Sequence, residues 1–283
     1  MEILQDFKTL RFWRHFLIKA FACFGAISTI LQTSNVVFPT FSGFQGLYSL
    51  VIVLVVALIG GLAWSWPRPI TQDYSAPKTK ISIVKGDMLD EKCHLVIGTN
   101  DTFDTETPNI ISQSSLQGQV LQRLYGGDFR LLDAELAKDL TAKPITGRIS
   151  KQGKQDRYGI GAVATVKQSG RLIFFSAYCA MDANNNSASS PDHVWLSLRL
   201  LWEEVSRKGN GGTVSIPVVG GGLARLSSLL PAQDAIRLTL LSFMFASRKS
   251  KICDELRVVV RRDDYKKLDR LELQSFLSSL RQS

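Results

Sequence analysis

The sequence predicts an α/β domain, a three-layer sandwich with a mixed sheet, preceded by a two-helix transmembrane hairpin. Three observations support this prediction. Residues 20–67 contain no Asp, Glu, Lys or Arg, which is the composition of a membrane-spanning segment. From residue 80 onward, strand-like and helix-like segments alternate along the chain. Gly220, Gly221 and Gly222 lie between the end of one such strand and the start of a helix.

Two apolar segments near the N-terminus are each long enough to cross a bilayer as a helix. The first covers residues 16–38 and the second covers residues 44–66, and about twenty apolar residues span a hydrocarbon core. Residues 39–43 between them contain proline and glycine, which favour a short turn. We therefore predict an antiparallel helical hairpin over residues 16–66.

The charges on either side of the hairpin predict its orientation. Basic residues collect on the cytoplasmic side of membranes, and here they flank both spans, whereas the loop between the spans carries no charge. We therefore expect a cell-membrane protein with two spans, a cytoplasmic N-terminal segment over residues 1–15 and a cytoplasmic C-terminus. The basic residues concerned are Lys8, Arg11, Arg14 and Lys19 before the first span and Arg68, Lys78, Lys80 and Lys85 after the second.

A signal peptide and a buried soluble hairpin are the alternatives to membrane spans. No small-residue cleavage site with a polar continuation follows the first segment, and a second apolar span comes at once. A soluble helix needs a polar side, and the second segment carries no charge on any side. Gln32, Ser34 and Asn35 in the first span favour helix–helix contacts or the membrane interface over lipid, and the first of these locations allows self-association.

The second part of the chain is predicted to begin after a linker. Residues 67–79 are interpreted as that linker because they contain three prolines among polar residues. The α/β domain then covers residues 80–283. Its first strand is expected over residues 81–84, which alternate between apolar and polar, and its second over the apolar residues 94–98.

The middle of the domain contains both kinds of periodicity. Helical periodicity is present over residues 116–124 and over residues 131–140. Residues 158–166 and 172–178 have the composition of strands, and the turn residues 168–170 lie between them. We therefore predict two helices followed by a β-hairpin.

A well-marked helix start opens the last third of the domain. Ser190 is a good N-cap residue, Pro191 fits the first helical position, and Gly209 marks the end of the helix. The elements expected after it are a strand from Val214 to Val219, a helix over 232–247, a strand over 256–260, and a charged helix with Leu268, Leu271, Leu273 and Leu277 on its apolar side.

Composition argues against two classes of function. The net charge of +9 comes from dispersed basic residues with no aromatic-interleaved stripe, so we expect no nucleic-acid partner. The cysteines and histidines form no cluster with metal-ligand spacing, so we expect no metal and no disulfide framework, and His94 and His193 are interpreted as structural or surface residues. These residues are Cys23, Cys93, Cys179, Cys253, His15, His94 and His193.

The three consecutive glycines are the strongest sign of a binding site. Glycines allow the backbone to approach a ligand closely and to turn N–H groups toward a phosphate, and ligands collect beyond the carboxyl ends of strands in such sheets. The spacing fits neither a P-loop nor the Rossmann fingerprint. A tight turn without a ligand is the alternative interpretation.

Three segments in order resemble the first strand, second strand and glycine loop of a macro domain. They are residues 81–88, 95–101 and 216–223. The resemblance extends from about residue 80 to the C-terminus and implies a three-layer macro-domain-like sandwich that binds ADP-ribose or a relative. It implies that Asp87 and Met88 contact the adenine. It also implies that the phosphates are bound by Gly220, Gly221, Gly222, Leu223 and Ala224.

Two departures from the family pattern argue against catalysis. Macro-domain hydrolases hold the distal ribose with an asparagine-alanine-rich stretch and a glycine-rich loop, and residues 98–104 and 111–119 lack the glycine cluster. Asp101 and Asp104 are the nearest carboxylates, and we interpret them as solvated or capping residues of a polar loop. We therefore predict no catalytic residue and no cofactor, with an ADP-ribose derivative as ligand.

The whole arrangement resembles the membrane-bound, macro-containing effectors of bacterial Thoeris anti-phage defence. That resemblance implies a TIR-domain partner that makes a nucleotide signal, histidine-conjugated ADP-ribose. It further implies that the bound signal drives homo-oligomerisation and membrane disruption, which kills the infected cell. It assigns Asn100, Asp101, Ser115 and Gly118 to the distal end of the ligand. Arg261 and Arg262 are candidates to stack on the base or to pair with phosphate, and a solvated surface position is the alternative for both.

Three hypotheses of different classes follow. The first is a membrane effector that binds an ADP-ribose-derived signal, which must favour the assembled state to drive assembly. The second is a membrane-anchored hydrolase of ADP-ribosyl groups. The third is a scaffold in which the hairpin tethers an α/β domain that has no ligand. Ligand-induced stabilisation and turnover distinguish the three.

Overall fold

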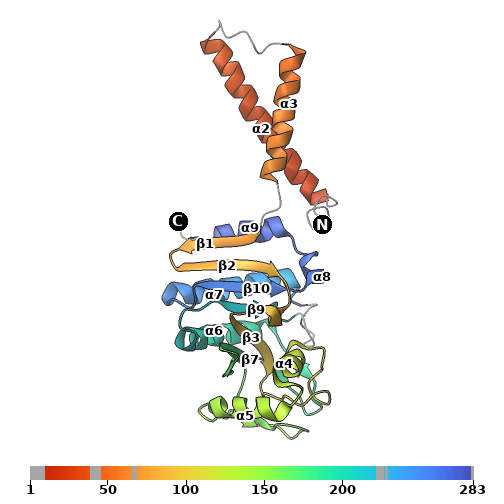
Figure 1. The fold of residues 1–283 in the computed structure, drawn as a ribbon, viewed down its shortest axis with the longest axis vertical. Helices are drawn as coiled ribbons and strands as arrows, with labels where there is room; N and C mark the ends of the chain where they lie inside the picture. The colour runs from red at the N-terminus through yellow and green to blue at the C-terminus, as the bar shows by residue number, and fades with distance from the viewer. Residues whose placement is uncertain (1–9, 39–45, 66–68, 221–225, 227–228, 282–283) are drawn as a thin grey trace. The chain divides into compact units, whose positions relative to one another are not determined.

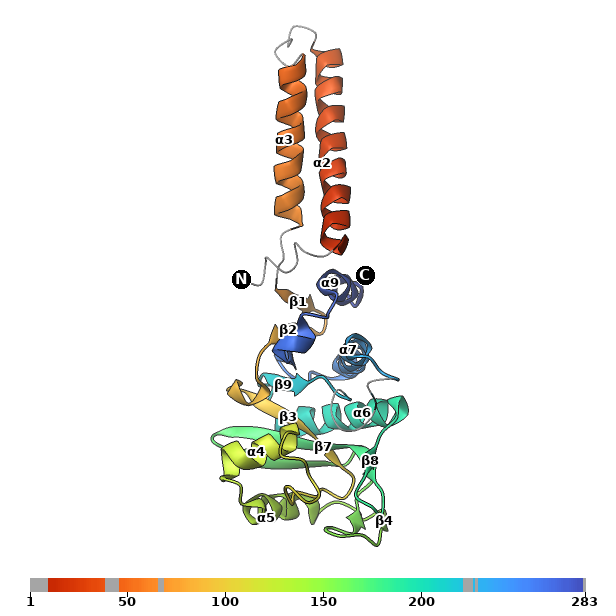
Figure 2. The same cartoon turned by 90° about the vertical axis from the view of Figure 1, so that its right-hand side faces the viewer.

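The computed structural model describes residues 10–38, 46–65, 69–220, 226 and 229–281. The chain forms two compact units, Met1–Arg68 and Pro69–Ser283. Figure 1 and Figure 2 show the elements of each unit, and the two units are described separately here.

The first unit is a pair of long apolar helices. Helix α2 covers Leu10–Val37 and helix α3 covers Leu47–Trp64. Both are long and apolar enough to cross a membrane, and the structure confirms the two apolar helices predicted, although α2 begins before residue 16 and α3 is shorter than residues 44–66. The predicted turn at residues 39–43 lies outside the described residues.

Small residues bring α2 and α3 together. Val53, Ala57 and Gly61 are the buried residues of α3, and a Cβ atom at Gly61 would lie 2.8 Å from the Cβ atom of Ala20 in α2. Glycine therefore permits a close approach of the two helices that any larger residue would prevent. The Lys19 ammonium lies 4.4 Å from the centre of the Trp64 ring, which adds a cation–π contact at one end of the pair.

The second unit contains a mixed sheet in the strand order β1-β2-β10-β9-β3-β7-β6. The five central strands from β2 to β7 are parallel to their neighbours, whereas β1 and β6 run antiparallel at the two edges. Short strand β8 (Ser187–Ala188) pairs with β7. The strands are β1 (Ile70–Ser75), β2 (Lys78–Lys85), β3 (His94–Asn100), β6 (Val163–Gln168), β7 (Arg171–Met181), β9 (Val214–Pro217) and β10 (Glu255–Val260).

Helices cover the two faces of this sheet unequally. Helices α6, α7 and α9 pack on one face, whereas α4 and α5 pack on the other face over β3, β7 and β6 (Figure 1). On the face that carries α4 and α5, strands β2 and β10 present polar side chains, which include Ser82, Glu255 and Arg257. Such side chains suit a part of a sheet that no helix covers. The helices are α4 (Leu116–Tyr125), α5 (Phe129–Leu140), α6 (Pro191–Lys208), α7 (Ala232–Lys249), α8 (Arg262–Tyr265) and α9 (Arg270–Ser279), with a 3₁₀ turn η1 at Met88–Asp90.

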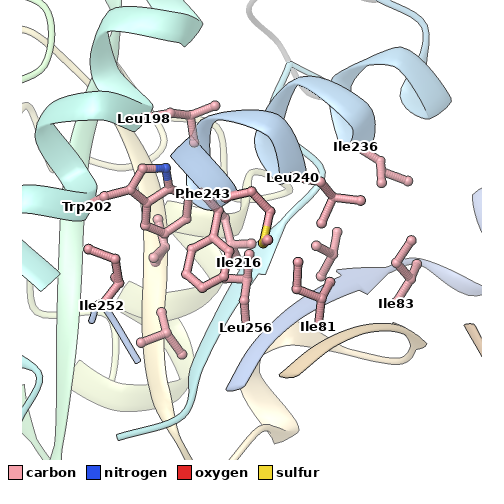
Figure 3. Packing of buried hydrophobic residues seen from close by; sticks show 14 of the residues in the cluster. Ile81, Ile83, Leu198, Trp202, Ile216, Ile236, Leu240, Phe243, Ile252 and Leu256 are labelled. Atoms are coloured by element: carbon pink, nitrogen blue, oxygen red, sulfur yellow. The ribbon is translucent and has the colours of Figure 1, made fainter. Parts of the chain in front are cut away.

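The larger core lies between the sheet and helices α6 and α7. Figure 3 shows Leu240 and Phe243 of α7 beside Ile81 and Leu256 of the strands, and Trp202 of α6 at the same level. The Trp202 indole N–H donates to the Ser242 hydroxyl at 3.0 Å, so the buried polar group is satisfied. This packing confirms the three-layer α/β architecture with a mixed sheet.

The predicted start of α6 is confirmed. The Ser190 hydroxyl accepts a hydrogen bond from the backbone N–H of His193, Pro191 begins the helix, and Gly209 is the C-cap residue. In the terminal helix, Leu273 and Leu277 are buried as expected, but Leu271 is 41% exposed, so it does not belong to the apolar side.

Two predicted boundaries are wrong. Residues 70–75 and 78–79 of the predicted linker 67–79 belong to β1 and β2, because Ile70 and Tyr74 of β1 are buried in the core and β1 pairs with β2. The predicted strand over residues 158–166 begins only at Val163. Gly159 and Gly161 adopt positive φ angles of 81° and 89°, which do not fit an extended strand.

Candidate functional site

A cavity of about 1770 Å³ lies at the carboxyl ends of the parallel strands. Gly86 at the end of β2, Asn100 at the end of β3 and Pro217 at the end of β9 line it, together with residues of the loop that precedes α4. Parallel strands bring their carboxyl ends to one edge of a sheet, and this edge is where ligands bind in such folds. Chain segments that are more than 100 residues apart therefore surround one cavity.

Asp87 lies at the β2 end of the cavity and caps η1. Its carboxylate accepts from the backbone N–H of Leu89 at 2.9 Å and from Arg123 at 2.6 Å. The Leu89 N–H, and to a lesser degree the Arg123 guanidinium, hold the pKa of Asp87 below its usual value, although partial burial opposes this. Asp87 is therefore an ionised hydrogen-bond acceptor at neutral pH. Met88 beside it is 5% exposed and packs in the core, which leaves mainly its backbone to face the cavity.

The predicted phosphate loop begins where β9 ends. Val218 and Val219 line the cavity, and Gly220 follows with a φ of 86°. A side chain at Gly220 would be strained by this φ, and its Cβ atom would lie 2.9 Å from Leu226. The other predicted phosphate residues, Gly221, Gly222, Leu223 and Ala224, lie outside the described residues.

Asn100 and Ser115 also line the cavity, and each shapes the backbone around it. The Asn100 side-chain oxygen accepts from the N–H groups of Thr102 and Asp104 at 3.1 and 3.2 Å, which fixes the turn after β3. The Ser115 hydroxyl caps α4 by accepting from the N–H of Gly118 at 3.0 Å. Gly118 packs against the backbone of Ser112, where a Cβ atom would lie 2.3 Å from the carbonyl oxygen, and it does not line the cavity.

The interpretation of Asp101 and Asp104 as solvated or capping residues is wrong. Both are buried, with 2% and 1% of their surfaces exposed. Asp101 pairs with Arg157 at 2.6 Å and accepts from the N–H of Met181, and it does not line the cavity. Asp104 pairs with Lys151 at 2.8 Å. Both carboxylates are therefore paired with cations and have a structural role, and neither is free to act as a general base.

The sequence reasoning missed these cations. Lys151, Lys154 and Arg157 belong to the segment that contains the short strands β4 (Gly147–Arg148) and β5 (Asp156–Arg157). Lys154 donates its backbone N–H to Asp104 at 2.9 Å and its ammonium to the carbonyl of Phe103 at 2.7 Å. No local pattern could have identified these contacts, because the partners are about fifty residues away in the sequence.

The sequence reasoning also missed Tyr178. Its ring lies in the cavity wall against the backbone of Gly98, where a Cβ atom would lie only 2.2 Å from the ring. The nearby Cys179 also lines the cavity. Burial, followed by the charge of Asp101, raises the pKa of the Cys179 thiol to about 12, so at neutral pH this thiol is protonated and a poor nucleophile.

Arg261 and Arg262 lie where β10 meets α8, and both line the cavity. Arg261 contributes to the low pKa of Asp87, which places it on the Asp87 side of the cavity. Lys92 and Arg257 also line the cavity, and Arg257 pairs with Glu91 at 3.2 Å. Asp90 and Asp264 line it as well, so this side of the cavity carries charges of both signs.

Histidine and metal chemistry find no support in the part of the chain that the structure describes. His94 has a structural role, since its Nδ1 atom accepts from the backbone N–H of Leu172 at 3.1 Å. Across the described ranges, no group of three or more His, Cys, Asp or Glu side chains is arranged to hold a metal ion.

Comparisons with known proteins agree with this fold. A variant of the Oceanobacillus iheyensis macrodomain with ADPR is 14% identical, with a TM-score of 0.52 over 74% of this chain and 99% of that chain. The same macrodomain with ADP is 14% identical, with a TM-score of 0.51 over 75% and 99% of the two chains. No curated protein matches the chain. The family model for the macro domain of the Thoeris protein ThsA matches residues 81–261, which is more than half of the sequence. The chain therefore belongs to the ThsA macro-domain family.

Proposed function

We propose that this protein is a membrane-anchored effector of anti-phage defence whose macro domain senses an ADP-ribose-derived signal. In this proposal a TIR-domain protein makes the signal, histidine-conjugated ADP-ribose. The bound signal promotes oligomerisation, and the assembled helices disrupt the cell inner membrane and kill the infected cell. Both chain termini lie in the cytoplasm, where the signal is made.

The main observation in support of the proposal is that one chain combines a ligand-sized cavity with two helices long enough to span a membrane. Helix α3 ends at Trp64 and strand β1 begins at Ile70, so only residues 65–69 connect the two units. The connection is too short to act as a long flexible tether. Assembly of the macro domains would therefore bring their hairpins together in the bilayer.

The size of the cavity leaves room for a nucleotide larger than ADP-ribose. Ligand pockets commonly hold about 300 to 1,000 Å³, and this cavity of about 1770 Å³ exceeds that range. Arg261 and Arg262 line the cavity and can pair with the phosphates of such a ligand. Asn100 and Ser115 line the cavity and provide neutral polar surroundings for a group attached to the distal ribose.

Calorimetric titration of the full chain in detergent with ADP-ribose and with its histidine conjugate tests the proposal. Mass spectrometry of the mixture follows the fate of the ligand. We expect the conjugate to bind more tightly than ADP-ribose and to be recovered unchanged. Hydrolysis of the conjugate would identify an enzyme, and binding of neither compound would favour a scaffold without a ligand.

The cellular part of the proposal needs a second measurement. Cells that contain this chain and a TIR-domain producer of the conjugate should lose membrane potential after infection. Cells that contain the chain with an inactive producer should keep it. Loss of potential in both cultures would show that the signal does not control the effector.

A further inference from the structure

The face of α2 that points away from α3 has an unusual composition for a lipid-facing surface. Its exposed residues include Ile18, Ala22, Gly25, Thr29, Gln32 and Val36, and we call this set the α2 seam. In contrast, every exposed residue of α3 is apolar or aromatic. The α2 seam thus combines small and polar side chains, which are enriched where helices contact each other in membranes.

The spacing of the α2 seam is that of a helix-packing surface. Successive seam residues are separated by steps of 4, 3, 4, 3 and 4 residues, which average about 3.6 and therefore form one continuous stripe along the α-helix. A Cβ atom at Gly25 would meet no other atom within 4 Å, so the centre of the seam is open to an approaching helix. The contact between α2 and α3 uses the opposite side of α2, at Ala20.

Gln32 indicates which kind of partner covers the seam. Among the described residues, its side-chain amide has no hydrogen-bond partner, whereas the Thr29 hydroxyl donates to the carbonyl of Gly25 in its own helix at 2.8 Å. Hydrocarbon offers no partner to an amide, and an unpaired polar group there costs free energy. Ser34 and Asn35, which follow closely in α2, are half-buried, and Thr33 is exposed but lies about 100° from Gln32 around the helix, so none of the three belongs to the seam.

We propose that the α2 seam is the contact surface between copies of this chain in the membrane. In an assembly with its rotation axis along the membrane normal, the α2 helices run parallel and equivalent residues meet at the same depth. Gln32 then faces Gln32 of the second copy, and an amide suits this position because it both donates and accepts. Ala22 and Gly25 allow the backbones to approach closely. The inference rests on the proposed membrane location and specifies the surface through which assembly occurs.

Disulfide crosslinking of the full chain in bacterial membranes tests the seam. Thr29→Cys places a thiol on the seam, and Ile30→Cys places one about 100° away on the same helix, at a residue that is 65% exposed. Both are made in a Cys23→Ala background. We expect severalfold more crosslinked dimer from Thr29→Cys than from Ile30→Cys. Equal crosslinking at both positions, or crosslinking at neither, would overturn the proposal.

A second pair of variants tests the role of the amide. Gln32→Leu should weaken self-association in nanodiscs by about threefold to tenfold, and Gln32→Asn should restore most of it. A Leu variant that associates as strongly as the wild type would remove Gln32 from the contact. Titration of the wild type and of the same variants with histidine-conjugated ADP-ribose distinguishes the two proposals. If the wild type does not bind the conjugate, the sensing function is refuted. The crosslinking pattern tests the α2 seam independently of ligand binding.

Discussion

The ion pair between Lys151 and Asp104 is almost completely shielded from solvent, with side-chain exposures of 0% and 1%. It fastens the segment around β4 and β5 to the turn that follows β3. The same turn is held to α4, because the Gln117 amide donates to the backbone carbonyl of Asp104 at 2.6 Å. Asn100 and Gln117 line the cavity, so this buried pair helps to fix the cavity wall.

Lys151→Met should destabilise the macro unit by about 3 to 5 kcal/mol, because it leaves the buried Asp104 carboxylate without its cation. Thermal unfolding of the purified chain in detergent measures the effect. Lys266→Met is the matched control, since Lys266 pairs with Asp263 on the surface, with exposures of 50% and 88%, and such pairs contribute little. Equal melting temperatures for the two variants would contradict the structural importance of the buried pair.

We propose that Asp87 accepts a hydrogen bond from the adenine amine. Asp87→Asn should then weaken the binding of ADP-ribose by about tenfold, because an ionised carboxylate is a stronger acceptor than an amide is. Titration calorimetry measures the dissociation constant. Asp90→Asn serves as the control, since Asp90 pairs with the same Arg123 side chain at 2.6 Å and is 71% exposed. If both variants lose affinity equally, then the Arg123 pairing and not the position of Asp87 accounts for the effect.

At the level of elements, the contact between β1 and α9 closes one edge of the sheet. The Tyr74 hydroxyl donates to the carbonyl of Leu277 at 2.7 Å, and the Gln274 amide donates to the carbonyl of Thr71 at 3.1 Å. Unpaired edge strands invite unwanted pairing with other chains. Helix α9 therefore helps to cover edge strand β1, which follows the two apolar helices in the sequence.

The stability of the macro unit should fall at high pH partly through Tyr74. Burial raises the pKa of Tyr74 to about 12, against the opposing effect of Arg281 and Arg248. Because the pKa of Tyr74 is higher in the folded state than the value of about 10 in the unfolded state, its contribution to stability is complete below about pH 10. This contribution is lost as the pH rises from about 10 to about 12. Tyr74→Phe should lower stability by about 1 kcal/mol at pH 8 and reduce the loss above pH 10.

Urea unfolding of the wild type and of Tyr74→Phe at a series of pH values measures both effects. Tyr158→Phe is a suitable control, because Tyr158 shows a smaller pKa elevation and lies away from α9. An unchanged slope of stability against pH in Tyr74→Phe would show that other groups control the alkaline transition.

At the scale of the whole molecule, the two units should be separable by mutation. Val53 is 7% exposed and lies in the contact between α2 and α3. Val53→Asp should prevent insertion of the hairpin and abolish membrane damage, since a carboxylate at the centre of a span costs about 3 kcal/mol. Binding of the ADP-ribose conjugate by the macro unit should remain unchanged, because its core contains no residue of the first unit.

Membrane fractionation, a membrane-potential dye and calorimetry measure these three properties on the same variant. Val53→Leu is the control and should behave like the wild type in all of them. Membrane damage by Val53→Asp would show that the hairpin is not the damaging element.

The sequence by itself determined the division of the chain and most of its elements. The charge-free residues 20–67 predicted the apolar helices, because a helix that is apolar on every side has no surface suited to contact with water. Ser190 and Pro191 located the start of α6, because caps and first-turn prolines act through the nearest backbone groups. The segments that resemble macro domains also led to the correct family. All of these signals are local.

Only the tertiary structure decided which distant residues meet. Pairing with β2 and burial against α9 turned residues 70–75 from an expected linker into β1. Asp104 and Asp101 were expected to be solvated or capping residues of a loop. In the structure they are buried and form ion pairs with Lys151 and Arg157. Burial and pairing depend on the neighbours of a residue in space. Many of these neighbours come from distant parts of the sequence, and they are brought together only when the chain folds. The cavity depends on the same principle, since separate strands contribute its walls only after the sheet has formed.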